Sequence, residues 1–234
     1  SSILFILGIK MLGKESTAVK GNFLSAIAML LAVLVTTLSL EINLLTIMVA
    51  ILIGASVGSL IALKVKMTAI PEMVALFNGF GGLASFFIAW SQYSEPNINL
   101  FQTVIVMLTV YIGGLTFSGS LIEYGKLAEK IKLGKGALLT NVFISAFYLS
   151  LLMLVFVLID PVFLDFLDNQ PTLFYVFLSF TILAGLGFVL PIGGGDMPVV
   201  ISLLNSLSGI AAAFAGLLLL NLSLIHISEP TRLA

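Results

Sequence analysis

Four polar side chains in this sequence could carry or orient a proton, and each lies in or beside a long apolar run. Asp196 and Asn205 belong to the stretch GGGDMPVVISLLNSLSG, residues 193–209. Asn78 opens NGFGGLAS, and Ser120 closes GLTFSGS. Carboxylates, amides and hydroxyls form hydrogen bonds, and burying them without a partner is costly. We therefore expect these four groups to have partners, a function or both.

The elements that must position these groups are membrane-spanning helices. Of the 234 residues, 60% are hydrophobic and only 9% are charged, and the mean hydropathy is +1.22, far from the composition of a soluble domain. Apolar runs long enough to cross about 30 Å of hydrocarbon as a helix lie near 23–40, 44–63, 73–91, 100–118, 137–159, 173–190 and 199–221. The runs do not alternate apolar with polar residues, so helices are favoured over barrel strands.

We predict an all-α fold, a polytopic transmembrane helix bundle of about seven complete spans after a truncated first span in residues 1–12. The transmembrane helical domain covers 1–221 and is expected to be truncated at both ends. Residues 222–234 hold the sole histidine and the sole arginine without any pattern, and we interpret them as a non-native or artefactual tail.

Charged residues predict the orientation of the helices. With strict alternation, one side of the membrane receives Lys10, Lys14, Lys20, Lys64, Lys66, Lys126, Lys130, Lys132 and Lys135. The other side receives Glu41, Glu95, Asp160, Asp165 and Asp168. By the positive-inside rule the lysine-rich side is cytoplasmic or its equivalent. The longest loop on that side, near 119–136, is expected to be a short amphipathic or solvated stretch.

Polar and small residues recur at helical spacing on three of the spans. The stripes are Ser202, Asn205, Ser206, Gly209 and Ala213; Asn78, Gly81, Gly82 and Ser85; and Thr109, Gly113, Thr116 and Ser120. Helix packing is an alternative explanation for each stripe, since polar bonds across membrane helices contribute about 0.6 to 2 kcal/mol. Their similar depth, in the cytoplasmic half, favours a shared polar path. We expect Asn78 and Asn205 to face the bundle interior, because an amide exposed to lipid is costly.

Asp196 also has a simpler explanation, because an acid just before Pro198 suits the N-cap of the following helix. The rest of the chemical inventory is small. No acid or base lies in the middle of a predicted span. The sequence has no G-x-G-x-x-G fingerprint after a strand, no Walker pattern and no metal-ligand cluster, so we predict neither a catalytic group, a nucleotide site nor a metal in this segment.

Three stretches together carry a resemblance to a known family. They are GGGDMPVVISLLNSLSG (193–209), MTAIPEMVALFNGFGGLAS (67–85) and GGLTFSGSLIEYGKL (113–127). In this order along the chain they closely resemble the membrane domain of the beta subunit of proton-translocating NAD(P) transhydrogenase. The resemblance extends from about residue 3 to 221.

The resemblance implies an enzyme complex that is Re/Si-specific and passes a hydride between NAD(H) and NADP(H), coupled to inward proton translocation. It implies that both nucleotides are bound by domains outside this segment, since the NADP(H)-binding domain is absent here, and that the fragment is inactive alone. The implied partners are the transhydrogenase alpha subunit, the missing NADP(H)-binding domain and a second alpha-beta unit in a dimer, with no nucleic acid. The expected location is the bacterial inner (plasma) membrane.

The resemblance also assigns roles to the four polar residues. Asn78, Ser120 and Asn205 correspond to members of the proton path, and Asp196 to the surface that couples to the NADP(H) domain. Many family members have a histidine at the position of Asn78. An asparagine does not titrate near neutral pH, so here it can only orient water or a partner, and the proton-carrying base could then lie on an alpha-subunit helix.

Two other classes of function remain open at this stage. A secondary transporter could use LPIGGGDMP, residues 190–198, as the break in a discontinuous helix at a substrate site. The predicted position near the cytoplasmic edge and the lack of an inverted repeat speak against it. A purely structural membrane subunit is the other alternative, because the predicted spans carry no titratable group in their middle.

Overall fold

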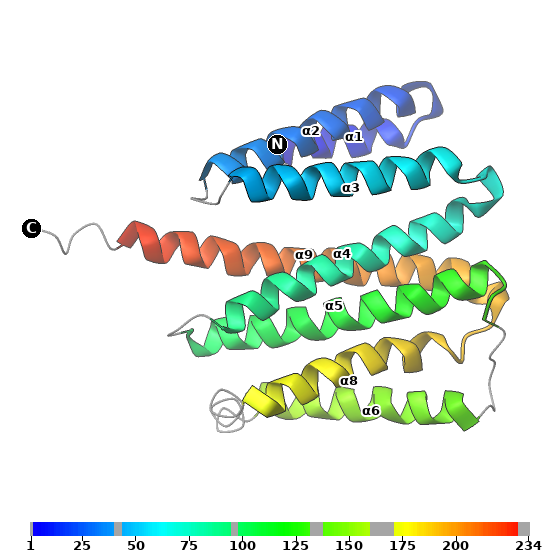
Figure 1. Cartoon of the computed structure of the whole chain (residues 1–234), viewed down its shortest axis with the longest axis vertical. Coiled ribbons are helices and arrows are strands. Elements are labelled where there is room, and N and C mark those ends of the chain that lie inside the picture. Colours follow the sequence, from blue (N-terminus) through cyan, green and yellow to red (C-terminus); the bar gives the residue numbers. More distant parts are fainter. Residues whose placement is uncertain (1, 40–43, 95–97, 132–137, 160–170, 229–234) are drawn as a thin grey trace, which may run out of the picture. The chain divides into compact units, whose positions relative to one another are not determined.

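The computed structural model describes residues 2–39, 44–94, 98–131, 138–159 and 171–228 (Figure 1). These residues form helices and no strand, which confirms the predicted all-α class. The chain divides into two compact units, Ser1–Val65 and Lys66–Ala234. The acidic residues expected on the side opposite the lysines lie outside the described residues, as do Lys132 and Lys135.

The first unit contains three apolar helices and a short 3-10 turn. They are α1 (Ser2–Leu12), η1 (Glu15–Thr17), α2 (Ala18–Ser39) and α3 (Leu44–Lys64). Helices α1 and α2 are adjacent and pack closely where two glycines meet: a Cβ atom added at Gly21 would lie 2.8 Å from the Gly8 carbonyl oxygen. No residue of α3 is buried among those that the structure describes.

The second unit contains all four polar residues singled out above. Its elements are η2 (Met67–Ala69), α4 (Ile70–Tyr93), α5 (Leu100–Leu127), α6 (Leu138–Ile159), α8 (Pro171–Val189), η3 (Gly194–Asp196) and α9 (Met197–Ser228). Across the described residues of both units, six helices are long and apolar enough to cross a membrane. Helix α6 has 22 residues, and its described apolar part is Thr140–Phe156. The seven predicted spans thus correspond to α2, α3, α4, α5, α6, α8 and α9.

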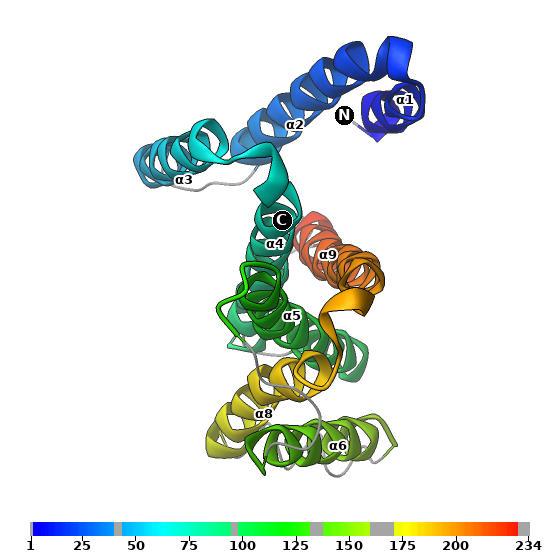
Figure 2. The same cartoon turned by 90° about the vertical axis from the view of Figure 1, so that its right-hand side faces the viewer.

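Helix α5 is the centre of the second unit. It contacts α4, α8 and α9, while α6 packs mainly on the far side of α8 (Figure 2). The helix begins at a capping box in which Asn99 accepts from the Gln102 backbone N–H and the Gln102 side chain accepts from the Asn99 backbone N–H. Reciprocal capping of this kind satisfies backbone donors that the first helical turn leaves free.

The far end of α5 corrects one prediction. The segment near 119–136 was expected to be a loop, but α5 continues to Leu127. It ends where Glu129 adopts a positive φ of 55° and the Lys130 N–H reaches back to the Gly125 carbonyl at 2.8 Å, the hydrogen-bond pattern of a Schellman C-cap. Apolar scoring ended the predicted span too early because polar residues occupy the last helical turns, which are nevertheless buried.

Glycines allow α4, α5 and α8 to approach closely. A Cβ atom at Gly113 of α5 would lie 2.7 Å from the Gly82 carbonyl oxygen of α4, and one at Gly82 would lie 2.9 Å from the Gly113 carbonyl oxygen. A Cβ atom at Gly185 of α8 would collide with the Leu115 carbonyl and the Ser118 hydroxyl of α5. Small residues at such crossings are the usual basis of close packing between membrane helices.

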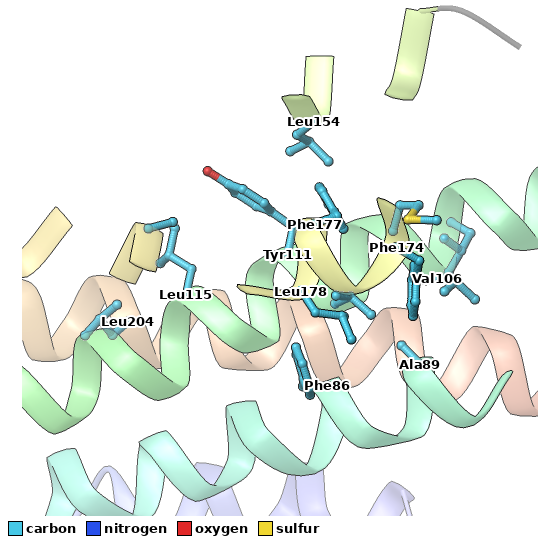
Figure 3. Close-up of a cluster of buried hydrophobic side chains, with 14 of the residues drawn as sticks. Phe86, Ala89, Val106, Tyr111, Leu115, Leu154, Phe174, Phe177, Leu178 and Leu204 are labelled. Atoms are coloured by element: carbon cyan, nitrogen blue, oxygen red, sulfur yellow. The ribbon is translucent and has the colours of Figure 1, made fainter. Parts of the chain in front are cut away.

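The apolar core of the second unit lies mainly between α5 and α8, with α4, α6 and α9 closing it (Figure 3). Phe174 and Phe177 of α8 are fully buried there. Phe174 stacks on Tyr93 of α4 with ring centroids 3.6 Å apart. The Tyr111 hydroxyl of α5 meets the Ser150 hydroxyl of α6 at 3.2 Å, so the polar tip of this buried ring has a partner, as is usual for buried tyrosines.

Candidate functional site

Asn78 connects three helices through hydrogen bonds. Its amide nitrogen Nδ2 donates to Ser120 Oγ of α5 at 3.1 Å, and Ser208 Oγ of α9 donates to its oxygen Oδ1 at 2.6 Å. The Ser208 hydroxyl has a second acceptor within reach, the Asn205 carbonyl oxygen at 2.8 Å. Two hydroxyls and one amide thus form a continuous hydrogen-bonded chain across α4, α5 and α9.

The packing of α4 on α5 explains why Asn78 reaches Ser120. Gly79 follows Asn78 directly, and a Cβ atom there would lie 3.1 Å from Ser120 Cβ. One turn further along α4, Gly82 touches the α5 backbone in the same way. Because neither glycine has a side chain, the two helices come close enough for a short amide to bond across the interface.

The polar stripe on α5 is buried completely. Thr109, Thr116 and Ser120 are each 0% exposed, and Gly113 is buried between them. Thr109 donates to the Ile105 carbonyl oxygen one turn earlier at 2.6 Å, whereas Thr116 Oγ1 has no hydrogen-bond partner among the described residues. The stripe on α4 is divided, since Gly82 and Ser85 are buried and Gly81 faces open space.

The stripe on α9 lies in the opposite environment. Ser202, Asn205, Ser206, Gly209 and Ala213 are all exposed. Within the second unit the Asn205 side chain therefore does not face the packed interior, and that it faces the interior of the complete bundle stays a prediction. The reason is rotational: α9 packs through Met197, Val200, Leu204, Ala211, Ala215 and Leu218, and a residue one position after Leu204 points about 100° away from that face. Ser208 has the orientation that was expected of Asn205.

Asp196 is exposed at the start of α9. It ends η3, where its backbone N–H donates to the Gly193 carbonyl at 3.1 Å. Among the described residues its carboxylate has no recorded hydrogen bond, so the capping explanation finds no support here. The region LPIGGGDMP is a connection between two helices, because α8 ends at Val189 and α9 begins at Met197. It is not a break in the middle of one span.

Lys126 holds the end of α8 against α5. Its ammonium group Nζ donates to the carbonyl oxygens of Val189 at 3.1 Å, Leu190 at 2.6 Å and Ile192 at 2.6 Å. An ammonium has three N–H donors, so all three are used. The last carbonyls of a helix lack intrahelical partners and carry partial negative charge, which explains why a cation is favourable here. The connection that leads to Asp196 is thus fixed to the end of α5.

Glu123 is a polar residue that the sequence reasoning missed, because it was assigned to a loop. It is 0% exposed, and neither carboxylate oxygen has a hydrogen-bond partner among the described residues. It lies one helical turn from Ser120 and one from Lys126. A helical wheel that continued α5 past residue 118 would have placed it on the face that contains Gly119 and Thr116.

These side chains can orient and exchange protons, but their chemistry does not extend to hydride transfer. The hydroxyls of Ser120 and Ser208 both donate and accept. The Asn78 amide fixes their positions and does not titrate. A buried carboxyl such as that of Glu123 can bind and release a proton. The described part of the chain contains no strand, and therefore no dinucleotide fold of the strand–turn–helix type.

Comparisons with known proteins agree with this reading of the chain as a membrane domain. The family model described as NAD(P) transhydrogenase beta subunit matches residues 1–228. Two curated relatives, both NAD(P) transhydrogenase subunit beta from Rhodospirillum rubrum and one of them from a defined strain, are 34% identical over 235 residues. Each match covers 96% of this chain, which spans 49% of the length of either relative. The chain therefore belongs to the NAD(P) transhydrogenase beta subunit family.

Proposed function

We propose that this chain is the membrane, proton-translocating part of a Re/Si-specific NAD(P)+ transhydrogenase, which couples hydride transfer between NAD(H) and NADP(H) to inward proton translocation. The observation that carries the proposal is the chain Ser120–Asn78–Ser208, which lies inside a helix unit of a member of this family. Apolar packing alone does not require three bonded polar groups from three helices.

Hydride transfer itself takes place elsewhere in the proposed complex. The segment consists of helices over its described residues and offers no dinucleotide fold, so NAD(H) and NADP(H) bind to domains outside it and the segment is inactive alone. Its partners are the alpha subunit, the NADP(H)-binding domain of the beta subunit and a second alpha-beta unit. The complex lies in the bacterial inner membrane, with the lysine-rich ends of the helices on the cytoplasmic side.

In this proposal the four polar residues act in two groups. Asn78, Ser120 and Asn205 belong to the proton path, where Asn205 is covered by a helix of the alpha subunit and Ser208 completes the contact between α9 and α4. Asp196 belongs to the surface on which the NADP(H) domain docks. Its exposure and the absence of a recorded bond to its carboxylate among the described residues support this assignment.

Coupling then follows from two docking states. If proton occupancy inside the bundle favours one position of the α8–α9 connection, it also favours the docking state that fits this position. Docking states that differ in nucleotide affinity are linked to proton binding by the same free energy in both directions. Lys126 supports this idea because it connects α5 to the end of α8, directly before the Asp196 segment.

The experiment that tests the function uses the full-length beta subunit, expressed with its alpha subunit and reconstituted in lipid vesicles. Hydride transfer is started by adding NADPH and an oxidised NAD analogue, and the internal pH is followed with a fluorescent dye. We expect a pH change that follows hydride transfer and disappears with a protonophore. Hydride transfer without a pH change, at a rate that the protonophore does not alter, would contradict the proposal.

A further inference from the structure

We infer that Glu123 is a proton-binding group of this membrane domain and supplies the titratable function that Asn78 cannot. The inference rests on the proposed function, because a proton-binding group has a use only where protons are moved. Among the described residues, Glu123 is the fully buried carboxylic acid. Both of its oxygens lack a hydrogen-bond partner within the described part of the chain.

The surroundings of Glu123 disfavour a permanent negative charge. Helices α5 and α8 run in parallel, since Gly114 contacts Thr181 and Gly119 contacts Val189. One turn past Gly119, Glu123 is therefore at the level of Leu190, which is 2% exposed. An ionised carboxylate that is buried is disfavoured unless it is paired, so burial favours the neutral acid at this position.

Nearby cations do not provide the missing partner. Lys126, on the same helix, has all three donors on carbonyl oxygens at the end of α8. Lys130 is exposed and lies over the Tyr124 ring at 5.2 Å from its centroid, with a hydrogen bond to the Tyr124 hydroxyl. Both ammonium groups are thus committed to other acceptors.

The elements packed against this end of α5 add charged groups of both signs, because Lys66 directly precedes η2 and α4. Glu72 of α4 and Asp196 before α9 lie at the same end of the unit as Glu123. Gly79 of α4 packs on Ser120 of α5. From this contact, the N-terminal part of α4 and the C-terminal part of α5 extend toward the same end. Helix α8 has no Asp, Glu, Lys, Arg or His in its sequence, and Tyr148 of α6 is exposed.

Ser120 provides a hydrogen-bond donor beside the Glu123 carboxyl group. Its Oγ accepts from Asn78, which leaves its own hydroxyl hydrogen free to be donated. Residues three apart on a helix are neighbours on its surface, so Ser120 can donate, directly or through one water, to an ionised Glu123. The hydroxyl would thus stabilise the transient carboxylate, while Asn78 keeps the hydroxyl in place.

The proposed step is the exchange of one proton between the Glu123 carboxyl group and water. With water admitted from the lysine-rich side, the acid loses one proton to water and becomes a carboxylate, and the reverse step restores the neutral acid. Access of water depends on the buried residues at this end of the unit. Leu190, Met197 and Val200 are 2%, 1% and 3% exposed, and they flank the connection that contains Asp196. A movement of this connection on docking would therefore admit water to Glu123.

The test uses infrared spectroscopy of the full-length beta subunit, assembled with its alpha subunit in lipid. A buried neutral carboxyl gives a separate C=O stretching band that disappears on ionisation. We expect the wild type to show such a band and to lose it as the pH is raised. Glu123→Gln should lack the band. The matched control is Glu129→Gln, which makes the same change at an exposed residue near the end of the same helix and should keep it.

A second measurement compares coupled and uncoupled turnover. Glu123→Gln should lower the rate of proton-coupled hydride transfer about a hundredfold, the scale of losing one proton-transfer group, and Glu123→Asp should restore part of it. Persistence of the infrared band in Glu123→Gln, or its absence from the wild type at every pH, overturns the inference, as does unchanged coupled turnover. If wild-type vesicles move no protons during hydride transfer, the proposed function fails instead, and the infrared titration still decides whether Glu123 binds a proton.

Discussion

Helices α5 and α9 carry the same kind of polar stripe and have opposite surroundings. In the most apolar window of α5, 67% of the residues are buried, whereas the corresponding share in α9 is 22%. The difference follows from their neighbours, because α5 is packed between α4, α8 and α9, whereas α9 packs mainly on α4 and α5 among the described helices of its unit (Figure 2).

This difference teaches that helical periodicity identifies a face but not the element that covers it. On α5 the stripe is covered by helices of the same chain, and its members are bonded or packed there. On α9 the stripe is exposed within the described residues of the second unit, although polar groups exposed to lipid are unfavourable. In the proposed complex, helices of the alpha subunit cover it.

The largest effect is expected from a side chain added at the α4–α5 crossing. In Gly113→Val the new Cβ atom would lie 2.7 Å from the Gly82 carbonyl oxygen and 3.0 Å from the Phe86 backbone nitrogen. Overpacking costs about 1–3 kcal/mol and sometimes more, and the rigid backbone here favours the upper end. We expect loss of the folded beta subunit, measured as the yield of monodisperse protein after detergent extraction.

The matched control for this prediction is Gly209→Val on the α9 stripe, where no atom lies within 4 Å of the added Cβ. We expect the full-length beta subunit to keep its yield and assembly with the alpha subunit to be weakened. Equal yields for both variants would mean that the α4–α5 approach is not as close as described, and normal assembly of Gly209→Val would mean that no helix covers the α9 stripe.

Lys126→Met should produce the next largest effect. The variant removes three charge-assisted hydrogen bonds and leaves the carbonyls at the end of α8 without their cation. A hydrogen bond to a charged group contributes about 1.5–3 kcal/mol, and we expect a total loss of about 3 kcal/mol because water replaces part of the bonding. Thermal unfolding of the full-length beta subunit in detergent measures the loss. Lys130→Met, which changes an exposed lysine, should lower the melting temperature much less, and equal shifts would rule out the capping role of Lys126.

The sequence predicted the helical class, and six of the seven predicted spans are confirmed by helices that are long and apolar enough over the described residues, because continuous apolar runs are direct evidence of membrane helices. It also predicted a polar path shared by the stripes that contain Asn78, Ser120 and Asn205, and the structure joins the first two by a hydrogen bond. It did not predict the length of α5. Both Glu123, which is buried, and Lys126, which is half-buried, are polar residues, and their burial depends on the helices that pack on α5.

The orientation of α9 could have been predicted from a different signal. Its apolar residues Met197, Val200, Leu204, Ala211, Ala215 and Leu218 recur at heptad-like spacing and face the core. Ser208 falls in this series, and Asn205 does not. The polar stripe was easier to see because it stands out in an apolar chain. In a membrane protein, however, the face of a helix that packs on other helices is often as apolar as the face that contacts lipid.

Asp196→Asn should change coupling without changing the fold. The side chain is exposed and keeps its shape in the variant, so only its charge is lost. Typical coupling free energies of 1–3 kcal/mol correspond to about 5- to 150-fold effects, and we expect proton-coupled hydride transfer to fall about tenfold. The assay is hydride transfer in vesicles with and without a protonophore. Coupling that is unchanged would remove Asp196 from the docking surface.

Asn205→Ala shortens a side chain on the exposed face of α9, whereas Gly209→Val adds one, so Asn205→Ala is the smaller change. The Asn205 side chain is exposed and forms no hydrogen bond with the residues that the structure describes, where only its backbone carbonyl is an acceptor. We therefore expect normal assembly and a proton movement that is slowed about fivefold, at the low end of coupling effects. The measurement is the rate of the vesicle pH change. Loss of assembly would instead show that Asn205 is a packing residue.

The smallest expected effect compares two serines two positions apart on α9. Ser208 donates to Asn78 across the helix interface, whereas Ser206 donates to the Ser202 carbonyl oxygen of its own helix and is exposed. Hydrogen bonds between membrane helices average about 0.6 kcal/mol, so Ser208→Ala should lower the unfolding free energy of the beta subunit by about that amount. Ser206→Ala should leave it unchanged, because the carbonyl keeps its bond within the helix.

The two serine variants are compared by thermal unfolding and by their proton-coupled turnover. If Ser208→Ala slows turnover more than this loss of stability explains, the hydroxyl belongs to the proton path as well as to the packing; if Ser206→Ala has the larger effect on both, the orientation of α9 differs from the one described.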